Sequence, residues 1–304
     1  MRSHRSFSSA SSVLSFAVLL QIACYRAPVK VDEAIVHTDV IGRHHAYWHD
    51  PTITAAHASR TVELASIVPM GATLVDLTHV FDEETIVWPT EKFGFRREGV
   101  SSGAGKDHYA NGRFSTPEHS GTHLDAPSHF AAGKHTADRV PLPRLMAQAV
   151  VIDIEAKAAT NPDAQLEPAD ISAFEALHGP IPPGAFVLVR TGWSDRWPDR
   201  KRYLGDDRPG EIDKLHFPGI APDAAKLLVD RDVGAVGIDT ASIDHGPSKA
   251  FEAQRTFASA DVPTFENVAS LRMVPETGAV VIALPMKIGE GSGGPARIVA
   301  FVPR

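Results

Sequence analysis

The chain has very little cysteine, no basic run and no long apolar run. Its single cysteine, Cys24, has no second thiol with which to form an intrachain disulfide, so a packed core has to stabilise the fold. Lys and Arg form no cluster, and the net charge of −7 disfavours binding to a phosphate backbone. These absences argue against a disulfide scaffold and a nucleic-acid-binding protein. The 43% of hydrophobic residues predicts an ordinary globular domain with a sizeable core.

Residues 1–24 have the composition of a targeting segment. Two arginines give a positive start, and residues 13–23 (VLSFAVLLQIA) form an apolar core that is too short to span a bilayer comfortably. The end of the segment resembles a bacterial lipoprotein signal, although Gln21 stands where an apolar residue is usual. We expect an exported protein, either periplasmic or anchored to the membrane by a lipid on Cys24. An uncleaved amphipathic tail is the alternative.

Residues 25–69 separate this segment from a domain at residues 70–304. They lack sustained periodicity and carry scattered histidines, which predicts a linker or a peripheral arm. A His-rich metal-binding tract is the alternative for this stretch.

The domain combines apolar runs with amphipathic segments. We expect strands at 73–80, 149–154, 185–190, 233–238, 279–284 and 298–302, helices at 142–147, 169–177, 221–230 and 251–260, and loops at 101–112 and 194–210. Strands alternate with helices in the middle, whereas the ends of the domain are all β. This order predicts an α/β fold with a mixed sheet.

The strongest chemical signal is the sequence HSGTHLDAPSH at residues 119–129. Four of its side chains can bind a metal or move a proton: His119, His123, Asp125 and His129. Imidazole and carboxylate ligands suit zinc, manganese or iron(II). Gly121 and Pro127 argue against a helix, and a proline cannot donate to a ladder, so we expect the ligands at a strand end and its loop rather than in mid-sheet. The alternative is a surface loop with uncommitted histidines, or a core corner where each imidazole bonds to backbone carbonyls.

Three further features of the sequence bear on function. Trp88 precedes a proline and therefore lies in an extended segment, where it could line a pocket for a flat substrate or cap the core. Glu266 is a carboxylate among apolar neighbours; a buried acid bonded to backbone amides is the alternative reading. The glycine-rich residues 289–295 predict a flexible turn and lack the Lys-Ser/Thr of a phosphate loop.

The motif at 119–129 resembles the signature of the metal-dependent cyclase/hydrolase family, which includes bacterial kynurenine formamidase and isatin hydrolase. Similar blocks follow the family order at residues 76–79, 88–89, 190–193, 237–244, 265–268, 283–288 and 293–295. The resemblance therefore covers about residues 70–304, and the C-terminal blocks are closer to the isatin hydrolase branch.

The resemblance implies a single catalytic domain with a swivelling β/β/α fold, which hydrolyses a C–N amide bond of a small molecule. It also implies a homo-oligomer, at least a dimer. By position, His119, His123 and Asp125 match the metal ligands of the family, Glu266 matches a further metal-binding carboxylate, and His129 matches the proton-transfer residue. We therefore expect Mn²⁺ or Zn²⁺ at this site.

Gln254 is the one departure from the family pattern. At this position, twelve residues before Glu266, formamidases carry a histidine that helps to hold a second metal. A neutral amide is a weak ligand, so we expect one metal ion per site. The alternative is that Gln254 is an amide on a helix surface.

Several functions remain open at this point. The first is an exported, isatin hydrolase-like enzyme that opens a cyclic or aryl amide. The second is an arylformamidase acting on N-formylkynurenine, against which export and Gln254 argue. The third is a non-catalytic exported metal- or ligand-binding protein, which would need no proton-transfer residue such as His129. Lactone or cyclisation chemistry also stays open, because resemblance in fold does not fix the substrate.

Overall fold

The computed structural model describes residues 71–102 and 108–304. The predicted targeting segment 1–24 with Cys24 and the predicted linker or arm 25–69 lie outside the described residues. Within the described ranges, every helix is too short or too polar to cross a lipid bilayer.

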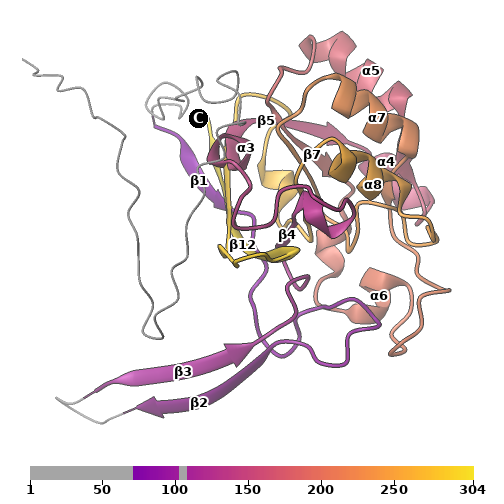
Figure 1. Cartoon of the computed structure of the whole chain (residues 1–304). Coiled ribbons are helices and arrows are strands. Elements are labelled where there is room, and N and C mark those ends of the chain that lie inside the picture. Colours follow the sequence, from indigo (N-terminus) through magenta and orange to yellow (C-terminus); the bar gives the residue numbers. More distant parts are fainter. Residues whose placement is uncertain (1–70, 103–107) are drawn as a thin grey trace, which may run out of the picture. The chain divides into compact units, whose positions relative to one another are not determined.

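The described chain alternates strands and helices in its middle and is mainly β at both ends (Figure 1). The strands are β1 (Thr73–Asp76), β2 (Arg96–Ser102), β3 (Ala110–Ser115), β4 (His123–Asp125), β5 (Met146–Asp153), β6 (Gln165–Leu166), β7 (Phe186–Arg190), β8 (Gly219–Ile220), β9 (Ala235–Ile238), β10 (Thr264–Glu266), β11 (Val280–Pro285) and β12 (Gly293–Val302). The α-helices are α3 (Leu142–Leu145), α4 (Glu155–Thr160), α5 (Pro168–His178), α6 (Arg200–Leu204), α7 (Pro222–Asp230) and α8 (Glu252–Ser259). Short 3-10 helices are η2 (Pro127–His129), η3 (Trp193–Arg196) and η4 (Leu271–Met273).

An eight-stranded mixed sheet is the framework of the domain. Its order is β1-β12-β11-β5-β7-β9-β10-β4, and β4 pairs with β12 as well as with β10. The second pairing closes the sheet into a barrel-like ring and leaves β1 outside it, on the edge of β12. Strands β5, β7, β9 and β10 run parallel, whereas the remaining pairings are antiparallel. The prediction of an α/β fold with a mixed sheet is therefore confirmed.

The central residues of β5, β7 and β9 are apolar because both faces of these strands are covered. On β5, Val150 and Ile152 point to the helices, where they join Phe174 and Leu228 in one core cluster. The alternate residue Val151 points into the ring and packs in a second cluster with side chains of β4, β10 and β11. In Figure 1, helices α4, α5, α7 and α8 lie together on one side of the sheet. The ring interior is thus a packed core rather than a channel.

The helices begin where the sequence provides suitable first-turn residues. Proline stands at the start of α5 and α7, where its missing N–H has no intrahelical acceptor to lose. Glu167 and Asp170 form a reciprocal capping box at the start of α5. These starts agree with the expected helices at 169–177 and 221–230 within two residues.

Three local predictions were wrong. Residues 101–112 were expected to be a loop, but residues 101–102 end β2 and residues 110–112 begin β3, the two strands of an antiparallel hairpin that projects from the body of the domain (Figure 1). The expected loop 194–210 contains α6 and most of η3. The last three residues of the glycine-rich turn, Gly293 to Pro295, begin the long strand β12. The hairpin was missed because its sequence is polar and has no apolar alternation.

Candidate metal centre and cavity

Strand β4 is the element that positions the centre. Its three residues are hydrogen-bonded on one side to β10 and on the other to β12, so that His123 lies opposite Glu266 and also opposite Pro295. As predicted, Asp125 ends the strand and His129 lies in the segment after it, but the expectation that the ligands avoid mid-sheet was wrong, because β4 lies between two strands. Pro127 does not interfere, because it lies beyond the strand and opens the 3-10 helix η2.

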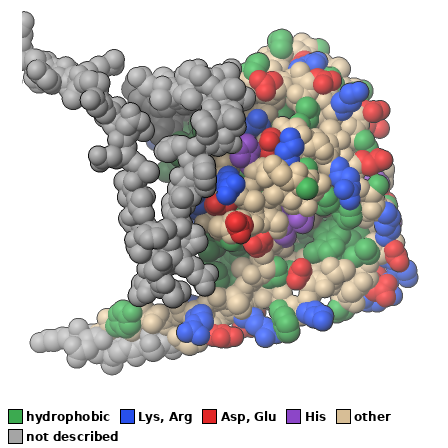
Figure 2. All heavy atoms as spheres, in the orientation of Figure 1, with side chains coloured by type: hydrophobic (Ala, Val, Ile, Leu, Met, Phe, Trp, Pro, Cys, Tyr) green, Lys and Arg blue, Asp and Glu red, His purple; other side chains and the backbone are tan. Residues whose placement is uncertain are grey.

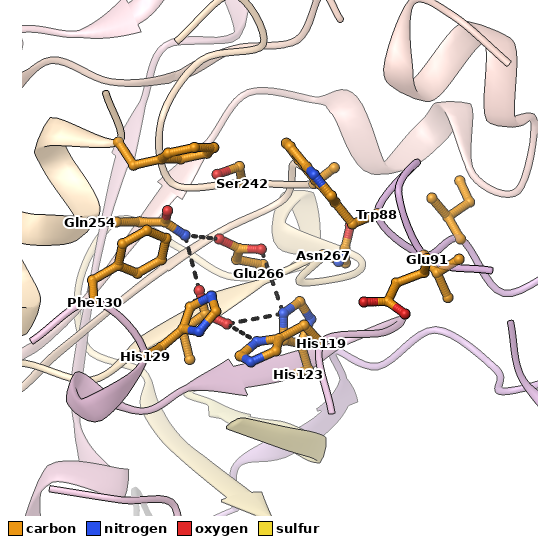
Figure 3. A pocket seen from close by; sticks show the side chains of 15 residues that line it. Trp88, Glu91, His119, His123, His129, Phe130, Ser242, Gln254, Glu266 and Asn267 are labelled. Atoms are coloured by element: carbon orange, nitrogen blue, oxygen red, sulfur yellow. Dashed lines mark hydrogen bonds and ion pairs between the residues drawn. The ribbon is translucent and has the colours of Figure 1, made fainter. Parts of the chain in front are cut away.

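The four predicted ligand side chains converge (Figure 3). Asp125 Oδ1 lies 2.6 Å from His119 Nδ1 and 3.1 Å from His123 Nε2. Glu266 Oε2 lies 3.5 Å from the same His123 nitrogen. Two overlapping groups could hold a metal ion, one of His123, Asp125 and Glu266 and the other of His119, Asp125 and His129. The alternative of uncommitted histidines in a surface loop is therefore wrong for His119 and His123.

The centre concentrates negative charge in a buried place. Burial and the neighbouring Asp125 charge together raise the pKa of Glu266 well above its ordinary value. Burial would also raise the pKa of Asp125, but His119 and His123 hold that pKa well below the usual range. Two adjacent buried carboxylates are costly unless a cation or hydrogen-bond donors compensate them.

The donor set fits a divalent cation. His123 Nδ1 donates to the carbonyl oxygen of Gly121 at 2.9 Å, so its Nε2 atom carries the lone pair that faces Asp125 and Glu266. This Nε2 atom is buried and has no hydrogen-bond partner among the described residues. An imidazole whose outer nitrogen is fixed by a carbonyl, and whose inner nitrogen faces two carboxylates, is the arrangement typical of a metal ligand.

Gln254 bridges the two carboxylates from helix α8. Its Nε2 atom donates to Asp125 Oδ2 at 2.9 Å and to Glu266 Oε1 at 2.7 Å. The side chain is only 5% exposed, so the alternative of a helix-surface amide is wrong. Glu266 Oε1 also accepts the backbone N–H of Ile243 at 3.1 Å, which leaves Oε2 to face His123. The amide therefore occupies the side of both carboxylates that faces away from the histidines.

His129 lies beside the ligands at the rim of the centre. Its ring stacks on that of His119, and it remains partly exposed to solvent. Burial by the surrounding protein lowers the pKa of His129 below 6.5, and the charges of His119 and His123 add to this effect. A neutral imidazole at neutral pH can accept a proton.

A cavity of about 230 Å³ opens above the carboxylates. Its polar floor consists of the centre itself, and its walls include Trp88, Phe130 and Phe251. Phe251 contacts both other rings, with centroids 6.2 Å from Trp88 and 5.6 Å from Phe130. On the face drawn in Figure 2, hydrophobic side chains gather in a hollow with histidine at its edge. Trp88 lines the cavity and also packs on a hydrophobic cluster.

Asn267 is a site residue to which the sequence reasoning assigned no role. Its Nδ2 donates to the carbonyl oxygen of Gly121 at 2.7 Å, and its own carbonyl accepts from Thr122 Oγ1 at 2.7 Å. Tyr203 donates to Asn267 Oδ1 at 2.9 Å. Gly121 has φ +54°, and a Cβ there would lie 2.7 Å from the Phe81 ring, so the turn before His123 requires glycine. The position of Asn267 directly after Glu266 was the available signal.

The fold and this centre agree with comparisons to known proteins. The family model described as a putative cyclase matches residues 75–245, and the chain belongs to this family. It is 35% identical to an isatin hydrolase of Roseibium aggregatum over 62% of this chain and 73% of that protein. It is 28% identical to a kynurenine formamidase of Salinibacter ruber over 74% of this chain and 96% of that protein.

Solved structures give the same relationship. Isatin hydrolase A from Labrenzia aggregata, bound to benzyl benzoate, matches with a TM-score of 0.69 and 34% identity, over 79% of this chain and 96% of that one. An isatin hydrolase bound to the product analogue thioisatinate also matches with a TM-score of 0.69, at 30% identity, over 83% of this chain and all of that one. The mixed α/β domain with its closed sheet is thus the fold of the isatin hydrolases.

Proposed function

We propose that this protein is a metal-dependent hydrolase that opens a C–N amide bond of a small cyclic or aryl amide, as isatin hydrolase does. The observation that carries the proposal is the buried centre of imidazoles and carboxylates at the floor of an aromatic-walled cavity. The similarity to isatin hydrolases in sequence and structure supports the choice of bond. We also assign the domain to the swivelling β/β/α type.

In this proposal His119, His123, Asp125 and Glu266 hold one Mn²⁺ or Zn²⁺ ion. When bound, the ion supplies Lewis-acid polarisation of a carbonyl and lowers the pKa of water. His129 then takes a proton from the attacking water and returns it to the nitrogen that leaves as the C–N bond breaks. Its lowered pKa supports the first step, because the ring is neutral and can accept the proton.

The cavity walls support an aromatic substrate. Trp88, Phe130 and Phe251 present ring faces and edges above the centre, and such surfaces favour flat apolar groups. A substrate with an aryl ring fused to an amide would place its carbonyl towards the floor while the ring contacts these walls. Trp88→Ala should therefore raise KM for an aryl amide more than it lowers kcat.

The second candidate is arylformamidase activity, which the similarity to kynurenine formamidases supports. A hydrolysis panel of isatin, N-formylkynurenine, a hydantoin-type ring and a lactone, run with protein of measured metal content, separates the candidates. Fastest turnover of isatin supports the first proposal, and fastest turnover of N-formylkynurenine supports the second. Bound metal without turnover on any of the four would favour the non-catalytic binding protein.

We further propose that residues 1–24 direct export, that residues 25–69 form an arm outside the catalytic domain, and that the protein is a homodimer. Lipid attachment at Cys24 would make it membrane-anchored. Fractionation of cells fed radiolabelled palmitate tests this, with Cys24→Ser as the control variant. Label in the wild-type membrane fraction, absent from the variant, supports the anchor; unlabelled protein in the periplasmic fraction supports export without it.

A further inference from the structure

A chain of polar contacts reaches His119 from the side opposite to Asp125. Ser292, in the glycine-rich segment, donates its hydroxyl proton to Glu118 Oε2 at 2.7 Å and its backbone N–H to the same oxygen at 2.8 Å. The Ser292 hydroxyl oxygen lies 2.8 Å from His119 Nε2. On its other side, His119 Nδ1 lies 2.6 Å from Asp125 Oδ1.

The number of protons fixes the direction of these contacts. A serine hydroxyl has one proton, and an ionised carboxylate can only accept. Since the Ser292 proton goes to Glu118, the contact between Ser292 and His119 needs its proton from His119 Nε2. The same count applies on the other side, where the ionised Asp125 carboxylate accepts a proton from His119 Nδ1 in the metal-free chain. Nδ1 is nevertheless the nitrogen that faces the carboxylates, whereas Nε2 faces Ser292, so a bound cation would take the place of the Nδ1 proton.

His123 has the opposite arrangement. Its Nδ1 atom faces the carbonyl oxygen of Gly121, which can only accept, and its Nε2 atom faces the carboxylates. The two imidazoles thus turn different nitrogens towards the same carboxylate oxygen of Asp125.

The backbone around Ser292 is built for this contact. The Ser292 carbonyl accepts the N–H of Ala126 at 2.9 Å, which ties the segment to the end of β4. At Gly293 a Cβ would lie 2.5 Å from His119 Cε1 and 2.4 Å from the carbonyl oxygen of Leu124. Only glycine allows the segment to approach the ring closely enough for the serine to reach it.

We propose that Glu118 and Ser292 are positioning residues that fix the tautomer of His119, so that His119 binds the metal through Nδ1 while His123 binds it through Nε2. The inference rests on the metal site in the proposed function, but not on its reaction. Outer partners of this kind orient the ring and raise the affinity for the ion.

Long-range ¹H–¹⁵N spectra of the full-length protein, labelled with ¹⁵N-histidine and loaded with Zn²⁺, test the assignment directly. His119→Gln and His123→Gln variants identify the two rings. We expect His119 to carry its proton on Nε2 and His123 on Nδ1. A Zn²⁺-loaded protein in which His119 is protonated on Nδ1, or in which His119 is unaffected by the metal, would overturn the proposal.

Chelator competition with Zn²⁺ tests the positioning role. Ser292→Ala should weaken Zn²⁺ binding by roughly 10- to 100-fold, the range typical of lost outer partners, whereas Ser292→Thr keeps the hydroxyl and should restore most of the affinity. Ser172→Ala, which removes an exposed hydroxyl on α5, is the matched control. Unchanged affinity in Ser292→Ala would contradict the role. If that variant does not fold, the wild-type spectrum alone decides the tautomer.

These measurements need no substrate. A protein that binds Zn²⁺ with the expected tautomers but hydrolyses no amide would sink the proposed function and leave this inference standing. Amide hydrolysis by a protein in which His119 binds Zn²⁺ through Nε2 would support the proposed function and contradict this inference.

Discussion

The imidazole rings of His119 and His129 stack, with centroids 4.0 Å apart and planes inclined by 25°. Stacking holds the His129 ring beside the candidate metal centre, although His129 belongs to η2 and not to the sheet. The same closeness places His129 in one of the two groups that could hold an ion. Whether His129 moves a proton or binds the metal is therefore a question that a single substitution can answer.

His129→Ala should lower kcat for amide hydrolysis by roughly 100-fold or more, because it removes the group that accepts and returns the proton. Metal content, measured by elemental analysis, should stay at the wild-type value. His178→Ala serves as the control. His178 ends helix α5 and bonds to Glu276, away from the centre. Loss of metal from His129→Ala would make this residue a ligand.

His123→Ala should remove the metal. The Nε2 atom of His123 lies near both Asp125 and Glu266, so the substitution removes the imidazole that the two carboxylates share. Equilibrium dialysis against Zn²⁺ or Mn²⁺ measures the effect. Full metal content in this variant would show that the ion binds elsewhere.

Gln254→His should change the number of bound ions from one to two. The amide of Gln254 donates to Asp125 and Glu266, whereas an imidazole there would offer a lone pair to a second cation beside the same carboxylates. Isothermal titration with Zn²⁺ gives the stoichiometry. Gln254→Leu is the matched control, since it removes both hydrogen bonds without adding a ligand; it should bind no more than one equivalent. Two equivalents in the wild type would contradict the expectation of a single ion.

His79 should make the metal-free protein less stable at acidic pH. Its ring stacks on Trp197 at 4.2 Å, and burial lowers its pKa to about 4. Between pH 6.5 and about 4, His79 binds a proton in the unfolded chain but not in the folded chain. The free energy of unfolding therefore falls as the pH falls through this window. The loss attributable to His79 is up to about 3 kcal/mol.

His79→Phe keeps an aromatic ring against Trp197 but cannot titrate. Urea unfolding of the metal-free wild type and variant at pH 7.5 and pH 4.5 isolates the contribution of His79. The variant should lose less stability on acidification than the wild type. Equal losses in the two proteins would exclude His79 as the cause.

The sequence was sufficient for the alternation of elements, and it singled out His119, His123, Asp125 and Glu266, which the structure brings together. Apolar runs such as those of β5 and β7 can be recognised in the sequence because both faces of these strands are buried. Strand β4 could not be recognised, since a strand of three residues is too short to show a period and Pro127 follows closely. Its partners β10 and β12 are more than a hundred residues away in the chain.

Gln254 shows a second limit. An amide on an amphipathic helix carries no sign of its partners, and Asp125 is 129 residues away in sequence. Ser292 was assigned to a flexible turn for the same reason, because a glycine-rich segment does not reveal that its backbone lies against a histidine ring. Long-range hydrogen bonds between polar side chains leave no periodic trace in the sequence.

The double pairing of β4 bears on how this protein acquires its ion. His123 and Glu266 face each other across a ladder that the backbone builds by itself, and Gln254 neutralises part of the repulsion between the carboxylates. The backbones that carry His123 and Glu266 are therefore held together by strand pairing, whereas small zinc domains depend on the metal itself for that role.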